Sequence, residues 1–267
     1  MNILVCLKQI LDPEVPARDF RIDREGLQAD PACANQVTNI FCENALETAL
    51  QIKDAAGGTV TALAFGRASA ADSLKKALAM KADNACLVLN QGPLHPDSTT
   101  TAKVLSAAIR KLGSFDLILL GREAGDWGAG QTGGLLAGEL GLPFLAFVDE
   151  IKETEDGLTL RRQTDTGCEV YAAPRPLVAT ITNSDRNQPR IPKTRDIILA
   201  GRRPLTTWTL GDLDLPAETL APESAACRVV DLYIPEQSNK CEFIEGESLD
   251  DKIDKLAGKI AEIIRTV

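Results

Sequence analysis

The first candidate for chemistry is a stretch dense in glycine. Gly121–Gly134 (GREAGDWGAGQTGG) holds six glycines among fourteen residues, between the apolar run Phe115–Leu120 and the helix-like run Leu135–Leu140. In open parallel sheets, ligands bind beyond the carboxyl ends of strands, where glycines let backbone N–H groups approach a phosphate and a helix N-terminus adds partial positive charge. The order of strand, glycine-rich loop and helix therefore predicts a phosphate-binding turn at these residues. Gln131 and Thr132 would then lie in the first helical turn, able to donate hydrogen bonds to phosphate oxygens.

The loop matches neither of two common nucleotide fingerprints. No GxGxxG follows the first expected strand, and no GxxxxGK[ST] occurs anywhere. A nucleotide is still favoured, but without a catalytic lysine in the loop. Trp127 could stack on a base. A flexible connection or a purely structural turn is the alternative interpretation, because a glycine-rich loop without a full fingerprint is weak support by itself.

Other catalytic chemistry is sparse. His95 is the only histidine and stands between Pro93 and Pro96, which indicates a surface loop and no catalytic triad. The seven cysteines are scattered, contain no CxxC pair and have no further histidines to complete a metal site. The composition therefore favours a binding or carrier protein over a hydrolase, with neither catalytic residues nor a metal.

Charge and cysteine usage restrict the setting. The formal net charge of −9 disfavours nucleic-acid binding, which needs a basic face. An odd number of cysteines in a chain of 267 residues argues against a disulfide framework and for reduced thiols. No signal peptide or apolar stretch of about 18 residues is found. We therefore expect a cytoplasmic protein that does not insert into a membrane.

The elements that must position the glycine-rich loop alternate along the chain. Short apolar runs indicate the following strands: Ile3–Leu7, Thr59–Ala64, Ala85–Leu89, Leu117–Leu120 and Leu177–Thr182. Helical periodicity marks residues 44–53, 69–80 and 99–112. The first four strands lie far enough apart for crossover helices, so residues 1–185 are predicted to form an α/β domain with an open, mainly parallel sheet flanked by helices.

The composition changes after residue 185. Residues 186–241 carry six prolines and little periodicity, so we expect an extended arm there and no packed sheet. Within residues 185–203, six cationic side chains outnumber two acidic ones, which indicates either a docking loop or an ordinary solvated face. Residues 248–264 carry one apolar stripe at helical spacing. The expected organisation is a domain over 1–185, an arm over 186–246 and a terminal helix over 247–267.

Several stretches together resemble the β subunit of electron-transfer flavoproteins. They cover most of the chain, in the family's order: Val5–Asp12 (VCLKQILD), Asn39–Glu47 (NIFCENALE), Ala77–Asp83 (ALAMKAD), the glycine-rich loop ending in Gln131-Thr132-Gly133, Arg162–Glu169 (RQTDTGCE) and Pro176–Thr180 (PLVAT). The resemblance implies a doubly wound, adenine-nucleotide-binding α/β fold. It also implies a heterodimeric electron carrier, whose α subunit binds the redox-active FAD and packs with the carboxyl-terminal portion of the β subunit.

In most members of that family the β subunit holds AMP as a structural ligand. Carried over by position, the nucleotide contacts would be Cys6, Asn39, Ile40, Phe41, Cys42, Phe65, Gly121, Arg122, Glu123, Ala124, Gly125, Asp126, Trp127, Gly128, Ala129, Gly130, Gln131 and Thr132. Gln163 falls near the place where the β subunit approaches the flavin of the α subunit. The resemblance implies no catalytic residue in the β subunit of a simple carrier.

The family also docks its partner dehydrogenases with an apolar side chain just before a proline. Ile191-Pro192 matches that position, with Arg190, Lys193 and Arg195 beside it. Such a loop suits transient docking, because charge raises the encounter rate. The implied partners are acyl-CoA or other flavin dehydrogenases as donors, and a quinone oxidoreductase or another acceptor downstream. The loop is shorter than the family's usual form, which leaves partner choice open.

Two other functions stay open at this stage. Bifurcating members place a second FAD in the β site and oxidise NADH, using the loop Asp-Gly-Asp-Thr-Ala-Gln-Val-Gly. Residues 126–133 here read DWGAGQTG, which keeps the first aspartate, loses the second, and has Thr132 as in the AMP-binding form. Gly130 replaces the asparagine of that AMP form, so the preference for AMP is slight. The third possibility is a free-standing adenine-nucleotide sensor.

Overall fold

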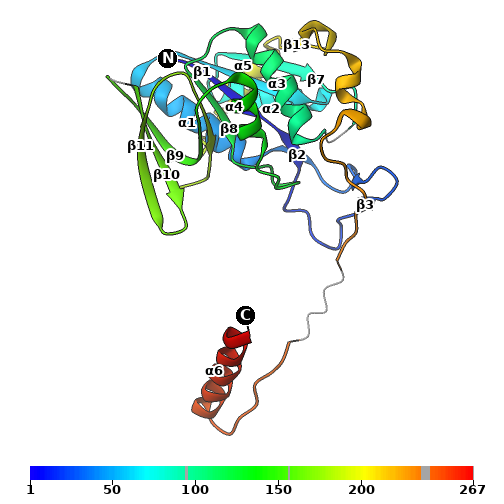
Figure 1. The fold of residues 1–267 in the computed structure, drawn as a ribbon, viewed down its shortest axis with the longest axis vertical. Helices are drawn as coiled ribbons and strands as arrows, with labels where there is room; N and C mark the ends of the chain where they lie inside the picture. Colours follow the sequence, from blue (N-terminus) through cyan, green and yellow to red (C-terminus); the bar gives the residue numbers. More distant parts are fainter. Residues whose placement is uncertain (94–95, 156, 236–240, 267) are drawn as a thin grey trace. The chain divides into compact units, whose positions relative to one another are not determined.

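The computed structural model describes residues 1–93, 96–155, 157–235 and 241–266. His95 therefore lies outside the described residues. The chain divides into a compact unit, Met1–Leu232, and a second unit that begins at Tyr233. Figure 1 shows the first unit as a twisted sheet between layers of helices, and in the second unit it shows the C-terminal helix. Each unit is described by itself below.

A nine-stranded sheet forms the centre of the first unit, in the order β11-β10-β9-β12-β8-β1-β6-β7-β13. Its strands are β1 Asn2–Leu7, β6 Thr59–Gly66, β7 Asn84–Leu89, β8 Leu117–Gly121, β9 Phe144–Thr154, β10 Gly157–Thr164, β11 Gly167–Ala173, β12 Leu177–Ile181 and β13 Thr206–Trp208. All pairs from β9 to β13 along this order are parallel, and only the pairs β9–β10 and β10–β11 are antiparallel. The five predicted strands are confirmed to within two residues.

Helices cover both faces, as in a doubly wound fold. The helices of the first unit are α1 Ile40–Ala56, α2 Ala71–Ala79, α3 Ser98–Leu112, α4 Thr132–Leu140 and α5 Thr194–Arg202. Alternate residues of β1 point to opposite faces. Ile3 and Val5 join one core with α1, α2 and Ala200 of α5, whereas Leu4 and Cys6 join the other core with α3 and α4. The predicted α/β class is confirmed.

Two small antiparallel pairs extend from the end of β1. β2 (Gln9–Leu11) pairs with β5 (Gln36–Thr38), and β3 (Ile22–Asp23) pairs with β4 (Gln28–Ala29). Sequence periodicity did not indicate them, because two or three residues are too few to show alternation. They bring residues 26–36 beside the carboxyl edge of the sheet, which matters for the cavity described below.

The expectation that residues 186–241 contain no packed sheet is wrong. β13 pairs in parallel with β7 and closes one edge of the main sheet. Ahead of it, α5 lies against α2, and Ala200 is only 3% exposed. The expected domain boundary at residue 185 therefore differs from the compact unit, which continues to Leu232. A strand of three residues directly after Pro204 is too short to be separated from a loop by its pattern.

The second unit contains the predicted terminal helix, α6 (Leu249–Thr266). The Ser248 hydroxyl accepts a hydrogen bond from the Asp251 N–H, and Lys255 forms an ion pair with Asp251 one turn away. No described residue of α6 is buried. Its apolar stripe is exposed along its whole length: Leu249, Ile253, Leu256, Ile260, Ile263 and Ile264. Among the described residues, no helix combines the length and apolar character needed to span a bilayer.

Candidate nucleotide-binding site

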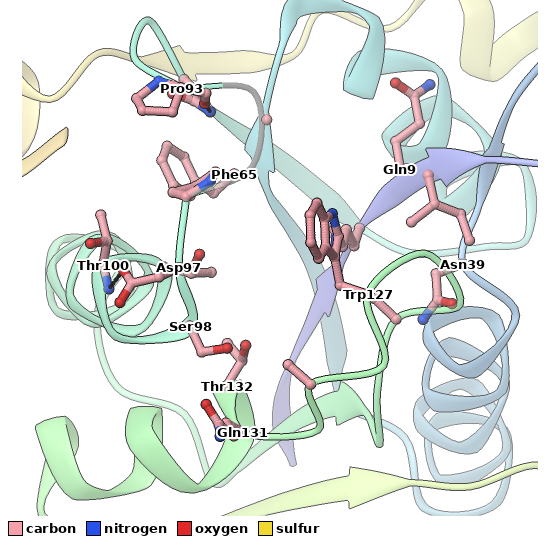
Figure 2. Close-up of a pocket in the computed structure, with 18 of the residues that line it drawn as sticks. Gln9, Asn39, Phe65, Pro93, Asp97, Ser98, Thr100, Trp127, Gln131 and Thr132 are labelled. Carbon is pink, nitrogen blue, oxygen red and sulfur yellow. Dashed lines mark hydrogen bonds between the residues drawn. The ribbon is translucent and has the colours of Figure 1, made fainter. Parts of the chain in front are cut away.

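A cavity of about 790 Å³ opens at the carboxyl ends of β1, β6 and β8. This volume lies within the roughly 300–1,000 Å³ that small-molecule pockets usually occupy. Figure 2 shows Phe65 and Trp127 on opposite sides of the cavity, with Ser98, Gln131 and Thr132 grouped below them. The predicted location beyond the strand ends is therefore where the structure has a pocket.

One buried side chain holds the glycine-rich loop in place through two hydrogen bonds. Asn39 is 1% exposed; its side-chain Nδ2 donates to the Glu123 carbonyl at 2.8 Å, and its Oδ1 accepts from the Gly125 N–H at 3.1 Å. A second contact comes from the residue directly after β1, since Lys8 Nζ donates to both carboxylate oxygens of Asp126 at 2.8 Å. Asn39, which the sequence assigned to the nucleotide, thus fixes the position of the loop.

The glycines of this loop serve two different purposes. Gly128 and Gly130 have φ angles of +61° and +64°, a left-handed conformation that glycine adopts without steric cost. Gly133 is needed for space, because a Cβ there would lie 2.2 Å from Thr180 Cγ2 on β12. The sequence interpretation assigned the glycines to phosphate approach, with a flexible or purely structural turn as the alternative. Gly133 instead lets α4 pack closely on the sheet.

The N-termini of α3 and α4 both reach the cavity, and only that of α3 is capped by a side chain. Asp97 precedes α3, and its carboxylate accepts the Thr100 N–H at 2.9 Å. Gln131 precedes α4 and makes no side-chain cap. The first amides of a helix have no partner within the helix, so they are available to an anion in front of it. The N-terminus of α4 is therefore the better place for a phosphate group.

The cations around the cavity are largely engaged by the protein itself. Lys8 pairs with Asp126, and Arg122 pairs with Glu123 at 2.9 Å. Arg67 donates to the carbonyls of Asn90 and Gly92 at 2.9 and 2.7 Å. A phosphate bound here would thus rely mainly on backbone N–H groups and hydroxyls, as the sequence predicted from the absence of a loop lysine.

Two buried thiols form part of the apolar floor. Cys6 and Cys42 are each 5% exposed and line the cavity. Burial raises the pKa of the Cys6 thiol, with Cys42 adding to the effect, and burial likewise raises the pKa of Cys42. Both side chains are therefore uncharged thiols at neutral pH. None of the seven cysteines forms a disulfide, in agreement with the expected reduced state.

One wall of the cavity comes from a segment that the sequence analysis assigned only to an arm. Residues 220–222, 225 and 227–229 line the cavity. The Asp97 carboxylate holds this segment by accepting the N–H groups of Ala226 and Cys227 at 2.9 and 3.3 Å. Burial alone would raise the pKa of Asp97, but these bonds and those from Thr100 outweigh it and lower the pKa. No motif in residues 220–229 indicated this role.

The predicted nucleotide residues divide into two groups. Those that line the cavity are Cys6, Asn39, Cys42, Phe65, Gly121, Arg122, Glu123, Ala124, Trp127, Ala129, Gly130, Gln131 and Thr132. Those outside its lining are Ile40, Phe41, Gly125, Asp126 and Gly128. Ile40 is 51% exposed, and the ring of Phe41 lies under the guanidinium of Arg122, 4.5 Å from ring centroid to Cζ. Sequence reasoning missed the lining residues of α3, Ser98–Thr101, which follow an ordinary capping signal.

The predicted flavin-side residue lies on β10. Gln163 Nε2 donates to Asp149 Oδ2 at 2.9 Å, and the same oxygen pairs with Arg161. Asp149 is 1% exposed, so this carboxylate is buried among donors. Hydrogen bonds to Cys168 and to Asp149 raise the pKa of Arg161. The hydrogen bond to Asp149 holds Gln163 near the carboxyl end of β10, beside the turn into β11.

The predicted docking residues have different surroundings. Ile191 is 92% exposed, next to Pro192. Arg190 instead bonds to Glu47 of α1 at 2.8 and 2.9 Å and to Asp54 at 2.8 Å, and these bonds raise its pKa. Lys193 and Arg195 stand at the start of α5 and contribute to the lowered pKa of Asp196, whose largest cause is the bond from Lys81. Arg190 therefore serves the fold, while Ile191 is presented to solvent.

Comparisons with known proteins identify the same family as the sequence resemblance. The family model described as "Electron transfer flavoprotein domain" matches residues 32–213. "Caffeyl-CoA reductase-Etf complex subunit CarD" of Acetobacterium woodii is 30% identical over 266 residues, covering 98% of both chains. "Electron transfer flavoprotein subunit beta" of Clostridium acetobutylicum is 30% identical over 272 residues, covering 99% of this chain and 98% of the relative. The mitochondrial β subunit of Oryza sativa subsp. indica is 36% identical over 221 residues, covering 80% and 84%.

Proposed function

The chain belongs to the electron transfer flavoprotein family, and we propose that it is the β subunit of a heterodimer that carries electrons between dehydrogenases and a downstream acceptor. The α subunit holds the redox-active FAD, and this chain holds AMP in the cavity of Figure 2 as a structural ligand. The heterodimer works in the cytoplasm, where its cysteines stay reduced. This chain then supplies positioning and docking surfaces and no catalytic residue.

The observation that carries the AMP assignment is the uncapped N-terminus of α4, which directly follows the glycine-rich loop. Gln131 gives α4 no side-chain cap, whereas Asp97 occupies the N-terminus of α3. The free amides at the start of α4 suit the phosphate group of AMP. A pyrophosphate would bring a second charged group toward an end of α3 that already holds a carboxylate. The aromatic rings of Phe65 and Trp127 on the cavity walls offer apolar contacts to an adenine.

Docking of donor dehydrogenases is assigned to Ile191 and the exposed face of α5. Ile191 is followed by α5, on which Ile197, Ile198 and Leu199 are each about half exposed. Lys193 and Arg195 at the start of the helix supply positive charge beside this apolar surface. A small apolar anchor next to cations suits a transient complex with an acidic partner, because charge raises the association rate and the anchor supplies binding energy.

A second candidate function is a bifurcating β subunit that holds its own FAD and oxidises NADH. The similarity to a subunit of a caffeyl-CoA reductase-Etf complex over 98% of the chain favours it, since that relative works inside a reductase assembly. The cavity also continues past the phosphate end to Gly26, Gln28 and the wall of residues 220–229, where a ligand larger than AMP would extend.

Nucleotide content separates these functions. The chain is produced together with an electron-transfer flavoprotein α subunit, the complex is purified without added nucleotide, and the released cofactors are quantified. One FAD and one AMP per heterodimer support the carrier. Two FAD support the bifurcating subunit. A stable single chain with an adenine nucleotide and no flavin contradicts both and supports the sensor.

The docking assignment has its own test. Replacing Ile191 with alanine is expected to slow reduction of the heterodimer by its dehydrogenase, because the anchor is lost, while FAD content and the unfolding temperature stay unchanged. Val170→Ala, which removes another exposed apolar side chain of the first unit, on β11 and not on α5 or the loop before it, is the control. Loss of flavin in the Ile191→Ala variant would assign this residue to the subunit interface instead.

A further inference from the structure

One face of α1 is polar and lies against residues 186–190, the segment just before the proposed docking anchor. The side chains of this face, spaced three or four residues apart, are Asn44, Glu47, Gln51 and Asp54. Asn44 Nδ2 donates to the Asn187 carbonyl at 3.0 Å, and Gln51 Nε2 donates to the Arg186 carbonyl at 2.9 Å. The two carboxylates bind within the same segment, so all four side chains hold it.

Glu47 makes the most extensive of these contacts. Its side chain is 6% exposed, and its carboxylate accepts from Nε and Nη2 of Arg190 at 2.8 and 2.9 Å. The backbone N–H of Arg190 donates to the same carboxylate at 3.1 Å. Paired hydrogen bonds between a guanidinium and a carboxylate fix their relative orientation. Because one carboxylate binds both the side chain and the main chain of Arg190, it sets the position of the backbone at this residue.

The backbone on either side of Arg190 has little freedom of its own. Pro189 stands before it, and Pro192 follows Ile191. A proline fixes its own φ and also restricts the residue before it to extended conformations. Ile191, which is 92% exposed, is therefore an apolar residue on a stiff backbone that α1 holds in place.

The chain is also held on the other side of the exposed isoleucine. Lys81, just after α2, forms an ion pair with Asp196 of α5 at 2.6 Å, and Lys75 Nζ of α2 donates to the Gly201 carbonyl at 3.0 Å. The chain is thus fixed by α1 before the anchor and by the region of α2 after it. An anchor held in this way loses little conformational freedom when a partner covers it, which is how preorganisation raises affinity.

We propose that Glu47 is a positioning residue for docking, which holds Arg190 so that Ile191 keeps the conformation that a donor dehydrogenase binds. This inference rests on the proposed function, because it needs Ile191 to be the docking anchor. Glu47 is buried in the chain and acts through Arg190, without touching the dehydrogenase. It therefore changes the affinity of docking and leaves the rate of electron transfer within the docked complex unchanged.

The proposal is tested by the steady-state kinetics of a donor flavin dehydrogenase that reduces the wild-type heterodimer. Glu47→Gln keeps the size of the side chain but loses its charge and one acceptor of the pair. The KM for the heterodimer is expected to rise about tenfold, because binding must now order the loop, while kcat stays unchanged. Arg190→Lys keeps the positive charge but loses the planar fork, so it should raise the KM in the same way. A wild-type KM in both variants overturns the proposal.

A double-mutant cycle separates positioning from a general loosening of the fold. If Glu47 acts by holding the anchor, adding Glu47→Gln to Ile191→Ala should leave the KM at the value of Ile191→Ala alone, because no anchor remains to be positioned. A further rise in the double variant overturns the proposal, since it shows that the two residues act independently. Arg190→Lys takes the place of Glu47→Gln in the cycle if the Glu47→Gln heterodimer does not assemble.

The matched control lies one turn earlier in the same helix. Glu43 has a side chain that is 13% exposed and forms an ion pair with Lys76, which lies on α2 and not in residues 186–190. Glu43→Gln should leave the KM unchanged, and a rise equal to that of Glu47→Gln overturns the proposal. An unchanged KM in Ile191→Ala defeats the docking assignment of the proposed function itself. A raised KM in Ile191→Ala with a wild-type KM in Glu47→Gln defeats only this inference.

Discussion

The nucleotide cavity and the exposed apolar surfaces of this chain differ in how many of their groups find partners within the chain. Around the cavity, polar groups find partners within the chain: Asn39 holds the loop, Lys8 holds Asp126, and Asp97 holds the wall segment. On α5 and α6, apolar side chains stand in solvent in rows. Under the proposed function, the chain builds its nucleotide site alone, while the proposed docking surfaces on α5 and α6 stay exposed until a partner covers them.

The two regions also differ in what stabilises them. The cavity rests on a parallel sheet whose strands are buried on both faces, such as Leu117–Leu120 at 5% exposure or less. The helix α6 has no buried residue, although most of the stability of a helix in a protein comes from packing of its amphipathic face. An apolar stripe on such a helix gains its free energy from burial against another surface. We therefore propose that α6 docks on the α subunit.

The largest expected effect is at α6, where a substitution tests whether the exposed apolar stripe binds the α subunit. Ile260→Asp places a charge in the middle of the apolar stripe, so association with the α subunit should weaken by about 2–3 kcal/mol, or roughly 30- to 140-fold in Kd. The unfolding free energy of the first unit should not change. The Kd is measured by titrating one subunit into the other, and the unfolding by denaturant.

The matched control is Glu262→Gln, on the opposite side of α6, which should leave the Kd within a factor of two. If Ile260→Asp associates as tightly as the wild type, α6 does not contribute to the heterodimer, and its exposed stripe needs another occupant.

Most of the fold could be predicted from the sequence because its signals are long and local. The strand from Leu117 to Leu120 is a continuous apolar run, and the helix over 99–112 shows both an apolar stripe and a capping aspartate. β13 could not be found this way. Its three residues pair with β7 only because α5 brings the chain back across more than a hundred residues, and no local pattern encodes that return.

The candidate site was predictable only where its residues follow a strand end. The position of Gln131 and Thr132 at the start of α4 is confirmed. The wall at residues 220–229 could not be predicted, because its contact with Asp97 joins positions far apart in the sequence. The orientation of Phe41 was also beyond prediction. The Phe41 ring lies outside the cavity lining, under the guanidinium of Arg122, and sequence adjacency to Asn39 carries no information about that contact.

A glycine substitution tests whether the cavity depends on the close packing of α4 against the sheet. Gly133→Ala puts a Cβ 2.2 Å from Thr180 Cγ2, so α4 must shift from β12. Overpacking of this kind costs about 1–3 kcal/mol of unfolding free energy, and AMP retention should fall because the amides in front of the phosphate move with the helix. Gly138→Ala, in the same helix with nothing within 4 Å of its Cβ, should stabilise by about 0.5–1 kcal/mol instead. Equal effects of both substitutions would show that packing at Gly133 is unimportant.

The smallest expected effect concerns the wall of the cavity and its dependence on pH. The pKa of Asp97 is lowered in the folded chain, so its carboxylate contributes stability above the unfolded pKa of about 3.9 and loses that contribution as pH falls through the lower folded value. Asp97→Asn still caps α3 but loses the charge that holds Ala226 and Cys227. The cost at neutral pH should stay below about 1 kcal/mol, because solvent screens this partly exposed carboxylate. Hydrogen exchange at the two amides should quicken at pH 7, and the acid loss of stability should be shallower than in the wild type. Unchanged exchange would mean that the wall is held by its apolar contacts, such as Leu220 against Gly92, and that even this edge of the cavity does not depend on the carboxylate.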